Sequence, residues 1–309
     1  MQDTLQSSDS SSNPDSNGEL RPGSTGELPP SDNGKIQRIN WINAAILVVT
    51  PFLTIVGLVL YISHEGVHIS DWVTFATLYF LTGLSITAGY HRYYSHRAYE
   101  CHPWVRFLFL VFGAAAFENS ALRWVSDHRN HHRYVDREGD PYNIKKGFVW
   151  AHIGWAFFES NLDESTLDNV KDLKRSKLVR WQHRFYVPIG ILAGFGSALL
   201  MGFYFGRPWG GLLWGGLVRM VALHHSTFLI NSAAHYFGSQ PYSSDNTARD
   251  NGWLALFSFG EGYHNYHHAY PSDYRNGTAW YHWDPTKWLI RSLSWAKLTW
   301  GMRSPSGRH

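Results

Sequence analysis

The chain has 309 residues, of which 44% are hydrophobic and 16% aromatic, and its formal net charge is +3. Its single cysteine, Cys101, excludes an intrachain disulfide and any metal site built from cysteines, so histidine must supply the ligands of any metal. Because the first 34 residues carry a charge of −5, about +8 remains on the rest of the chain. Together with long apolar segments, this basic balance favours a membrane surface or an anionic head group as partner, and no nucleic acid is expected.

Both ends of the chain are expected to lie outside the folded domain. Residues 1–34 are mostly Ser, Asp, Asn, Gly, Pro and Glu, and they have too little apolar surface to offset the entropy of ordering, which predicts a disordered acidic tail. No basic stretch followed by a short apolar core occurs in it, so no cleaved signal peptide is predicted. Residues 35–300 are predicted to form one membrane domain, and residues 301–309 a flexible C-terminus.

Four apolar segments predict transmembrane helices, because each is close to the roughly 20 residues that cross a bilayer as a helix. The first two and the last two are joined by short connections and form two hairpins. The last span contains Arg219, His224 and His225, which should face protein rather than lipid. Residues 104–117 are apolar but too short to span easily, so they are expected in the interface or against the bundle. The approximate limits of the four spans are 41–62, 72–90, 185–206 and 209–231.

The distribution of positive charge predicts the orientation in the membrane. Residues 91–184, between the hairpins, contain 15 Lys and Arg, whereas residues 63–71 contain none. By the positive-inside rule, the middle segment and both termini are cytoplasmic. The predicted fold is therefore an all-α integral membrane protein, with four transmembrane helices in two hairpins and a cytoplasmic helical cap.

Nine histidines gather on the same predicted side of the membrane, and the pattern HxxHH occurs twice among them. On a helix, residues three or four positions apart share a face, so each HxxHH directs at least two imidazoles toward one point. Nine imidazoles exceed the three or four ligands of one zinc site, which favours two metal ions. Imidazole binds Fe, Zn, Cu and Ni, so the ligand type leaves the metal open. The nine are His91, His96, His128, His131, His132, His235, His264, His267 and His268.

Carboxylate and amide side chains lie within a few residues of these histidines. A metal-bound histidine normally donates its other ring N–H to a carboxylate or carbonyl, which fixes its tautomer. Some of the neighbouring polar side chains are therefore expected to hold the histidines, and the others to be solvated loop residues. The candidates are Asp127, Asn130, Asp136, Asp140, Glu261 and Asn265.

The motifs HRYYSH, DHRNHH, NSAAHYFG and EGYHNYHHAYPSDYR stand in an order and spacing that resemble the membrane fatty acyl desaturases, and among them the stearoyl-CoA type Δ9 desaturases. The resemblance runs from about Trp41 to Trp288. It implies a diiron centre of two Fe²⁺ ions bound by the nine histidines, with Asn231 meeting one iron through water. With O₂ as co-substrate, such an enzyme introduces a cis double bond into a saturated long-chain acyl-CoA, in unsaturated fatty acid biosynthesis. A methylene C–H bond offers no charge or leaving group, so a redox metal must carry that step.

The same resemblance implies roles for four residues in binding the substrate. In the related enzymes the acyl chain enters a bent tunnel between the spans and the cap. Trp124 and Thr227 match its bend, and we expect them to place the C9–C10 bond near the irons. Asn43 and Asn119 match polar positions used for the head of an acyl-CoA.

The sequence departs from animal relatives at positions that would face CoA phosphates, with Ser126, Glu159 and Ser160 in place of basic residues. Arg123, Lys145, Lys146 or the basic run at residues 171–177 could substitute for them. Alternatively, the acyl chain is delivered on a glycerolipid or a carrier protein. No HPGG-type haem motif occurs, so a separate electron donor of cytochrome b5 or ferredoxin type, with its reductase, is expected on the basic cap.

Two other functions are compatible with histidine clusters in a membrane protein, but the sequence favours desaturation over both. A diiron membrane hydroxylase would use the same activated iron, but the sequence around the third histidine cluster favours desaturation. A metal transporter or sensor should place its ionisable residues near the bilayer midplane, whereas these cluster beside the cytoplasmic ends of the spans.

Overall fold

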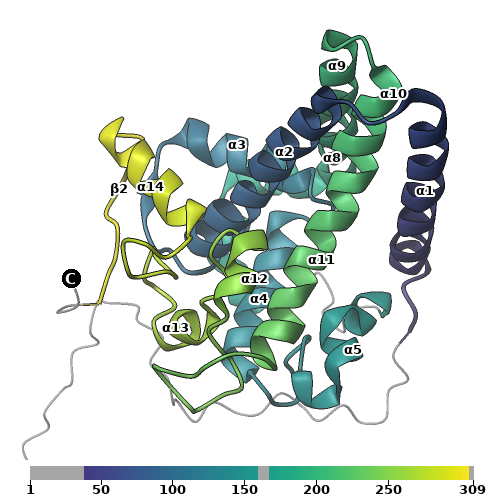
Figure 1. The fold of residues 1–309 in the computed structure, drawn as a ribbon. Helices are drawn as coiled ribbons and strands as arrows, with labels where there is room; N and C mark the ends of the chain where they lie inside the picture. Colours follow the sequence, from purple (N-terminus) through teal and green to yellow (C-terminus); the bar gives the residue numbers. More distant parts are fainter. Residues whose placement is uncertain (1–37, 159–166, 306–309) are drawn as a thin grey trace, which may run out of the picture. The chain divides into compact units, whose positions relative to one another are not determined.

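The computed structural model describes residues 38–158 and 167–305, so the predicted tail 1–34 and the last residues of the predicted C-terminus lie outside it. The chain begins with a helical hairpin (Figure 1). Its first helix starts at Asn40, whose side chain accepts a hydrogen bond from the Asn43 N–H at 3.1 Å, and it stops at Gly66, where φ is 68°. The hairpin consists of α1 (Trp41–Glu65), α2 (Ile69–Leu84) and the π-helix η1 (Ser85–Ser95), which continues α2.

A second helical hairpin packs against the first, with α2 lying along η7. Its two arms cross closely, because a Cβ atom on Gly211 would strike the carbonyl of Ala198 and the backbone of Gly202. Small residues allow this approach between apolar helices. The first arm is α8 (Tyr186–Gly190), η6 (Ile191–Gly196) and α9 (Ser197–Tyr204), and the second is α10 (Pro208–Gly210), η7 (Gly211–Val218) and α11 (Arg219–Ser232).

Shorter elements make up the rest of the described chain. The structure is mostly helical, as predicted. It also contains one antiparallel pair of short strands that was not predicted, β1 (Glu100–Cys101) and β2 (Thr299–Trp300). Strands of two residues carry too little periodicity to be recognised in sequence. The shorter helices are α3 (Pro103–Ala114), α4 (Ala121–Tyr134), η2 (Ile144–Lys146), α5 (Phe148–His152), η3 (Gly154–Phe157), η5 (Asp168–Val170), α6 (Lys171–Arg175), α7 (Lys177–Arg184), η8 (Ala233–His235), α12 (Gly252–Phe257), α13 (His264–Ala269) and α14 (Pro285–Trp295).

Within the described residues, three helices are long and apolar enough to cross a membrane: Trp41–Glu65, Ile69–Ser95 and Tyr186–Tyr204. The second hairpin arm, predicted as a fourth span over 209–231, is helical but is not among them. The apolar segment predicted at 104–117 forms α3, which is shorter than a span.

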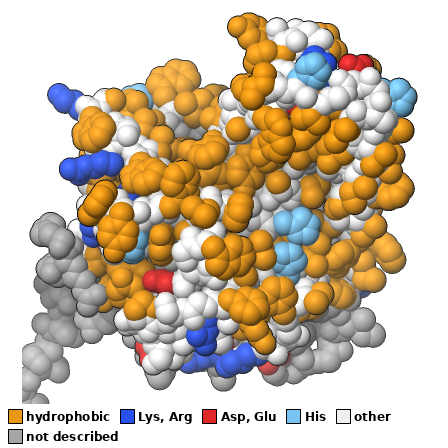
Figure 2. Space-filling view, in the orientation of Figure 1, with side chains coloured by type: hydrophobic (Ala, Val, Ile, Leu, Met, Phe, Trp, Pro, Cys, Tyr) orange, Lys and Arg blue, Asp and Glu red, His pale blue; other side chains and the backbone are white. Residues whose placement is uncertain are grey.

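The apolar surface is arranged as a membrane protein requires. Helix α1 has an apolar sequence yet is exposed along most of its length, with Phe52 at 64% and Ile55 at 63% exposure. In Figure 2, apolar side chains cover much of the region of α1 and α9, and Lys and Arg side chains lie mainly along the left and lower edges. Such a large apolar surface is stable in a bilayer and not in water. The main buried core lies where η1, α3 and α4 meet, around Tyr90, Leu110 and Val125.

Candidate metal centre

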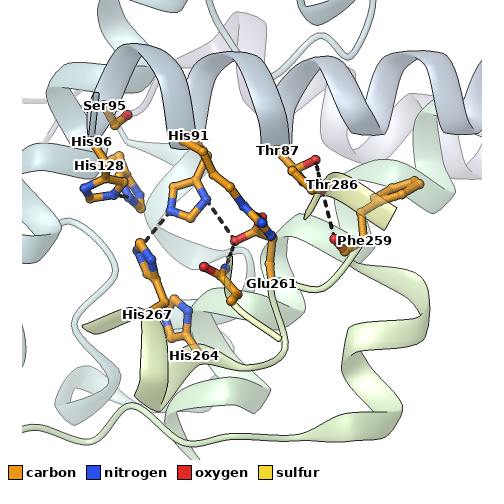
Figure 3. A network of polar contacts seen from close by, with 12 residues as sticks. Thr87, His91, Ser95, His96, His128, Phe259, Glu261, His264, His267 and Thr286 are labelled. Atoms are coloured by element: carbon orange, nitrogen blue, oxygen red, sulfur yellow. Dashed lines mark hydrogen bonds and ion pairs between the residues drawn. The ribbon is translucent and has the colours of Figure 1, made fainter. Parts of the chain in front are cut away.

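Four helical segments bring the nine histidines together. His91 lies in η1 and His96 directly follows it, His235 ends η8, and the two HxxHH motifs lie on α4 and α13. Figure 3 shows His91 reaching from η1 toward His267 of α13. The π-helical turns shift the side-chain directions of η1 relative to an α-helix, a deviation that is frequent at functional sites.

The histidines form two separate groups. Within each group, one nitrogen of every ring lies within 4.8 Å of the corresponding nitrogen of all the others. Each group therefore converges on a single point, as two metal sites would require. The first group is His91, His96, His128, His132 and His267, and the second is His131, His235, His264 and His268.

The spacing of the rings tests whether a metal would fit. Neighbouring Nε2 atoms in both groups are 2.8 to 3.2 Å apart. Two nitrogens that each lie about 2.1 Å from one metal, at right angles to one another, are separated by about 3.0 Å. Two lone pairs so close together repel unless a cation or proton lies between them. A donor set of imidazoles alone suits iron, zinc, copper or nickel, so both groups fit a transition metal.

Burial keeps most of these imidazoles neutral. The loss of water lowers their pKa well below the ordinary value, and the neighbouring imidazoles lower it further. Neutral imidazole is the form that binds a metal, so these seven rings have the charge state that binding requires. The affected residues are His96, His128, His132, His235, His264, His267 and His268.

Glu261 connects the first group to a buried ionic network. Its Oε2 lies 2.8 Å from His91 Nδ1. Its Oε1 accepts from Arg92 Nη2 at 2.9 Å, and Arg92 also donates to Asp284, the N-cap residue of α14. Figure 3 shows Glu261 placed between η1 and α13. Glu261 thus orients His91 with its Nε2 toward the other rings of the group.

Asp140 holds a histidine of the second group. Its Oδ1 lies 2.8 Å from His131 Nδ1 and also accepts from the Tyr142 N–H, and its Oδ2 accepts from the Asp136 N–H. Of the other polar candidates, Asn265 bonds to Tyr242 and other residues of the loop that follows η8. Proximity in sequence therefore predicted some of the supporting residues and not others.

A cavity opens beside both histidine groups. His91 and His128 of the first group, and His131 and His264 of the second, lie on its wall. Asn231 lines it as well. The remaining lining is largely apolar, from Gly83, Ile86, Thr87, Trp124, Leu223, Ser226, Thr227, Ile230, Ser258, Phe259 and Glu261.

Trp124 and Thr227 line this cavity, and one carboxyl group holds both. Glu118 accepts hydrogen bonds from Thr227 Oγ1 at 2.8 Å and from Trp124 Nε1 at 3.2 Å. The Trp124 ring in turn stacks on His128, with 5.0 Å between ring centroids. Glu118 thereby holds two cavity walls beside the first histidine group, a role that no sequence motif predicted.

Burial raises the pKa of Glu118 to about 7, although its bonds to Thr227 and Trp124 and the charge of Arg219 act in the opposite direction. Because the pKa is raised on folding, protonation of Glu118 stabilises the fold. This contribution is present below its ordinary pKa of 4.5 and is lost as the pH rises through about 7. Glu118→Gln keeps both bonds, since a hydroxyl either donates or accepts. Melting temperatures from pH 5 to 8.5 should therefore fall more steeply for the wild type than for the variant, and parallel curves would contradict this assignment.

The two remaining predicted residues lie elsewhere. The Asn43 N–H takes part in the cap of α1, and the Asn119 N–H donates to the Tyr186 hydroxyl at 3.0 Å. Neither residue lines the cavity described above. Their contact with a substrate head group stays a prediction.

Comparisons with known proteins all indicate the same family. A family model described as fatty acid desaturase matches residues 70–305. The chain is 41% identical to a probable acyl-CoA desaturase of Schizosaccharomyces pombe and 37% identical to acyl-CoA desaturase 1 of Saccharomyces cerevisiae, over 87% and 86% of its length. It spans about half of these relatives, 55% and 52% respectively. It is 36% identical to the sn-1 stearoyl-lipid 9-desaturase of Synechocystis, over 74% of this chain and 70% of the relative.

Proposed function

The chain belongs to the fatty acid desaturase family, and from this premise we propose that it is an O₂-dependent acyl-CoA Δ9 desaturase. The observation that carries the proposal is the apolar cavity that ends against both histidine groups. The reaction removes two hydrogens from adjacent methylenes, and with two electrons and two protons from a donor it reduces O₂ to two waters. Two Fe²⁺ ions held by the nine histidines would supply the activation of O₂, with Asn231 beside them.

The residues of the chain have the task of binding and orienting the acyl group. The cavity surrounds a saturated chain with apolar side chains, which favours its entry from water or membrane. Trp124, held by Glu118 and stacked on His128, limits where the chain bends. The relatives named acyl-CoA desaturases support CoA as the carrier, and the Synechocystis relative supports position 9. Its name also makes a glycerolipid-linked acyl chain the second candidate substrate.

The arrangement in the membrane follows from charge. We propose four spans, the fourth over 209–231, with both termini and the histidine groups on the cytoplasmic side. Fifteen Lys and Arg between the hairpins support this orientation. The desaturase domain would cover residues 35–300. A separate donor of cytochrome b5 or ferredoxin type, commonly acidic, would dock on this basic side and deliver the electrons.

The proposal is tested by expressing the chain in a host that lacks its own desaturase. Mass spectrometry then locates new double bonds, and isolated membranes are supplied with stearoyl-CoA or with stearoyl phospholipid. New Δ9 monoenes from acyl-CoA are expected. Monoenes formed only on intact phospholipid would mean that the acyl chain is carried by a glycerolipid and not by CoA. Hydroxylated chains would mean that the reaction is hydroxylation and not desaturation. Unchanged lipids would contradict the proposed function.

Enlarging the side chain at Thr227 should alter the product. Thr227→Phe adds a ring to the wall of the cavity and removes the hydroxyl that bonds Glu118, so the acyl chain can no longer pass that point in the same way. Loss of desaturation, or a double bond at another carbon, is expected in the lipid analysis. Thr77→Phe, on the exposed face of α2, is the matched control and should retain the wild-type product. An unchanged double-bond position in Thr227→Phe would make Thr227 a packing residue only.

A further inference from the structure

Thr247 contacts His235, a histidine of the second group, and is not among the residues predicted to support the histidines. Thr247 lies in the loop between η8 and α12, 12 positions after His235. Its Oγ1 is 2.8 Å from His235 Nδ1 and 2.6 Å from Asp136 Oδ1. The hydroxyl therefore stands between a carboxylate and a histidine whose Nε2 points to His264, 3.1 Å away.

The direction of these two hydrogen bonds follows from the hydrogens available. An ionised carboxylate has none to donate, so the single hydrogen of the Thr247 hydroxyl goes to Asp136. Toward His235 the hydroxyl oxygen can then only accept, and Nδ1 must carry the ring hydrogen. A neutral imidazole with hydrogen on Nδ1 has its lone pair on Nε2, the atom that faces the other rings of the group.

The backbone prepares the carboxylate for this contact. Asp136 has a φ of 62°, a left-handed conformation that costs energy in residues other than glycine, although Asp tolerates it better than most. Its N–H donates to Asp140, the residue that contacts His131. One turn after α4 therefore supports two histidines of the same group, His131 directly and His235 through Thr247.

We propose that Thr247 is a positioning residue that fixes the tautomer and the ring orientation of His235 in the four-histidine group. The proposal rests on the proposed function, since it requires His235 to bind a metal. The positioning role can be separated from a role in anchoring the loop. The Thr247 backbone N–H donates to Asp136 Oδ2 at 2.7 Å, and this bond does not depend on the side chain at position 247. Removing only the hydroxyl leaves that tether in place.

Two substitutions and a control test the role. Thr247→Val has nearly the same shape without the hydroxyl, and Thr247→Ser keeps the hydroxyl. Thr299→Val removes a hydroxyl that donates to the Ile290 carbonyl beside strand β2, and serves as the matched control. The full chain in detergent is loaded with ferrous iron without oxygen, and the iron per chain and its release to an excess of a ferrous chelator are measured.

The expected result is two irons in the wild type, with one of them bound about 10- to 100-fold more weakly in Thr247→Val, the usual effect of losing a partner of a metal-bound histidine, and released correspondingly faster. Thr247→Ser should restore the slow release, and Thr299→Val should match the wild type. Equal release from Thr247→Val and the wild type, or a serine variant as fast as the valine variant, would overturn the positioning role alone. A wild-type chain that binds no iron would instead overturn the metal centre, and the inference with it.

Discussion

His264→Ala is expected to abolish desaturation while the protein remains in the membrane. His264 is buried, with 2% of its surface exposed, and its Nε2 lies 3.1 Å from both His235 and His268. Alanine would leave the second group with three imidazoles, and the iron content should fall from two per chain toward one. Because the proposed reaction needs both irons, the loss of either group should stop turnover.

The measurement combines monoene formation in a desaturase-deficient host with iron analysis of the purified variant. His64→Ala is the matched control, since His64 is an exposed histidine at the end of α1. It should retain both irons and the wild-type activity. Residual turnover in His264→Ala would remove His264 from the ligands, and two tightly held irons in an inactive variant would point to a role in the reaction instead.

The sequence predicted the gathering of the histidines but not how they divide. Neighbours in sequence, His131 and His132, belong to different groups. Adjacent residues of an α-helix point about 100° apart, whereas residues four positions apart lie one above the other. Each HxxHH motif therefore gives its first and last histidine to one group and its middle one to the other. Each helix therefore contributes to both groups. Helix α4 gives two histidines to the first group and one to the second, and α13 gives one to the first and two to the second.

The supporting residues were harder to predict because they act across long separations in sequence. Glu118 meets Thr227 after 109 positions and Arg92 meets Asp284 after 192. Nothing in a local pattern indicates such a partner, whereas Asp140, nine positions from His131, was among the candidates. The family indicated by the histidine motifs is confirmed, because those motifs are local and specific.

The fold itself was predictable where a segment is continuously apolar. Helix α1 and the first helical hairpin follow directly from length and hydropathy. The last predicted span is not continuously apolar, because it contains Arg219, His224 and His225. In the structure, Arg219 donates to the carbonyls of Ala115 and Gly215, and His224 lies 2.8 Å from the Ala116 carbonyl. These contacts give Arg219 Nε and Nη1 and His224 Nε2 partners inside the protein, which a hydropathy argument does not detect.

The largest effect on stability is expected at Arg92, whose side chain is 1% exposed and lies between Glu261 and Asp284. Its guanidinium donates to both carboxylates and to the Tyr274 carbonyl at 2.7 Å. Arg92→Ala would leave two carboxylates without their buried countercharge. Breaking a buried ion pair in this way costs about 3–5 kcal/mol of unfolding free energy.

The melting temperature in detergent provides the measurement, and Arg97→Ala is the matched control. Arg97 pairs with Asp172 at 2.6 Å, but its side chain is 58% exposed, so its loss should cost less than about 1 kcal/mol. For a chain of this size the buried substitution should lower the melting temperature by about 10 °C and the exposed one by only a few degrees. Since Glu261 also contacts His91, a lower iron content is expected in Arg92→Ala and not in Arg97→Ala. Equal melting temperatures for the two variants would mean that water or a rearranged side chain replaces the buried guanidinium, and that the network contributes little to the position of His91.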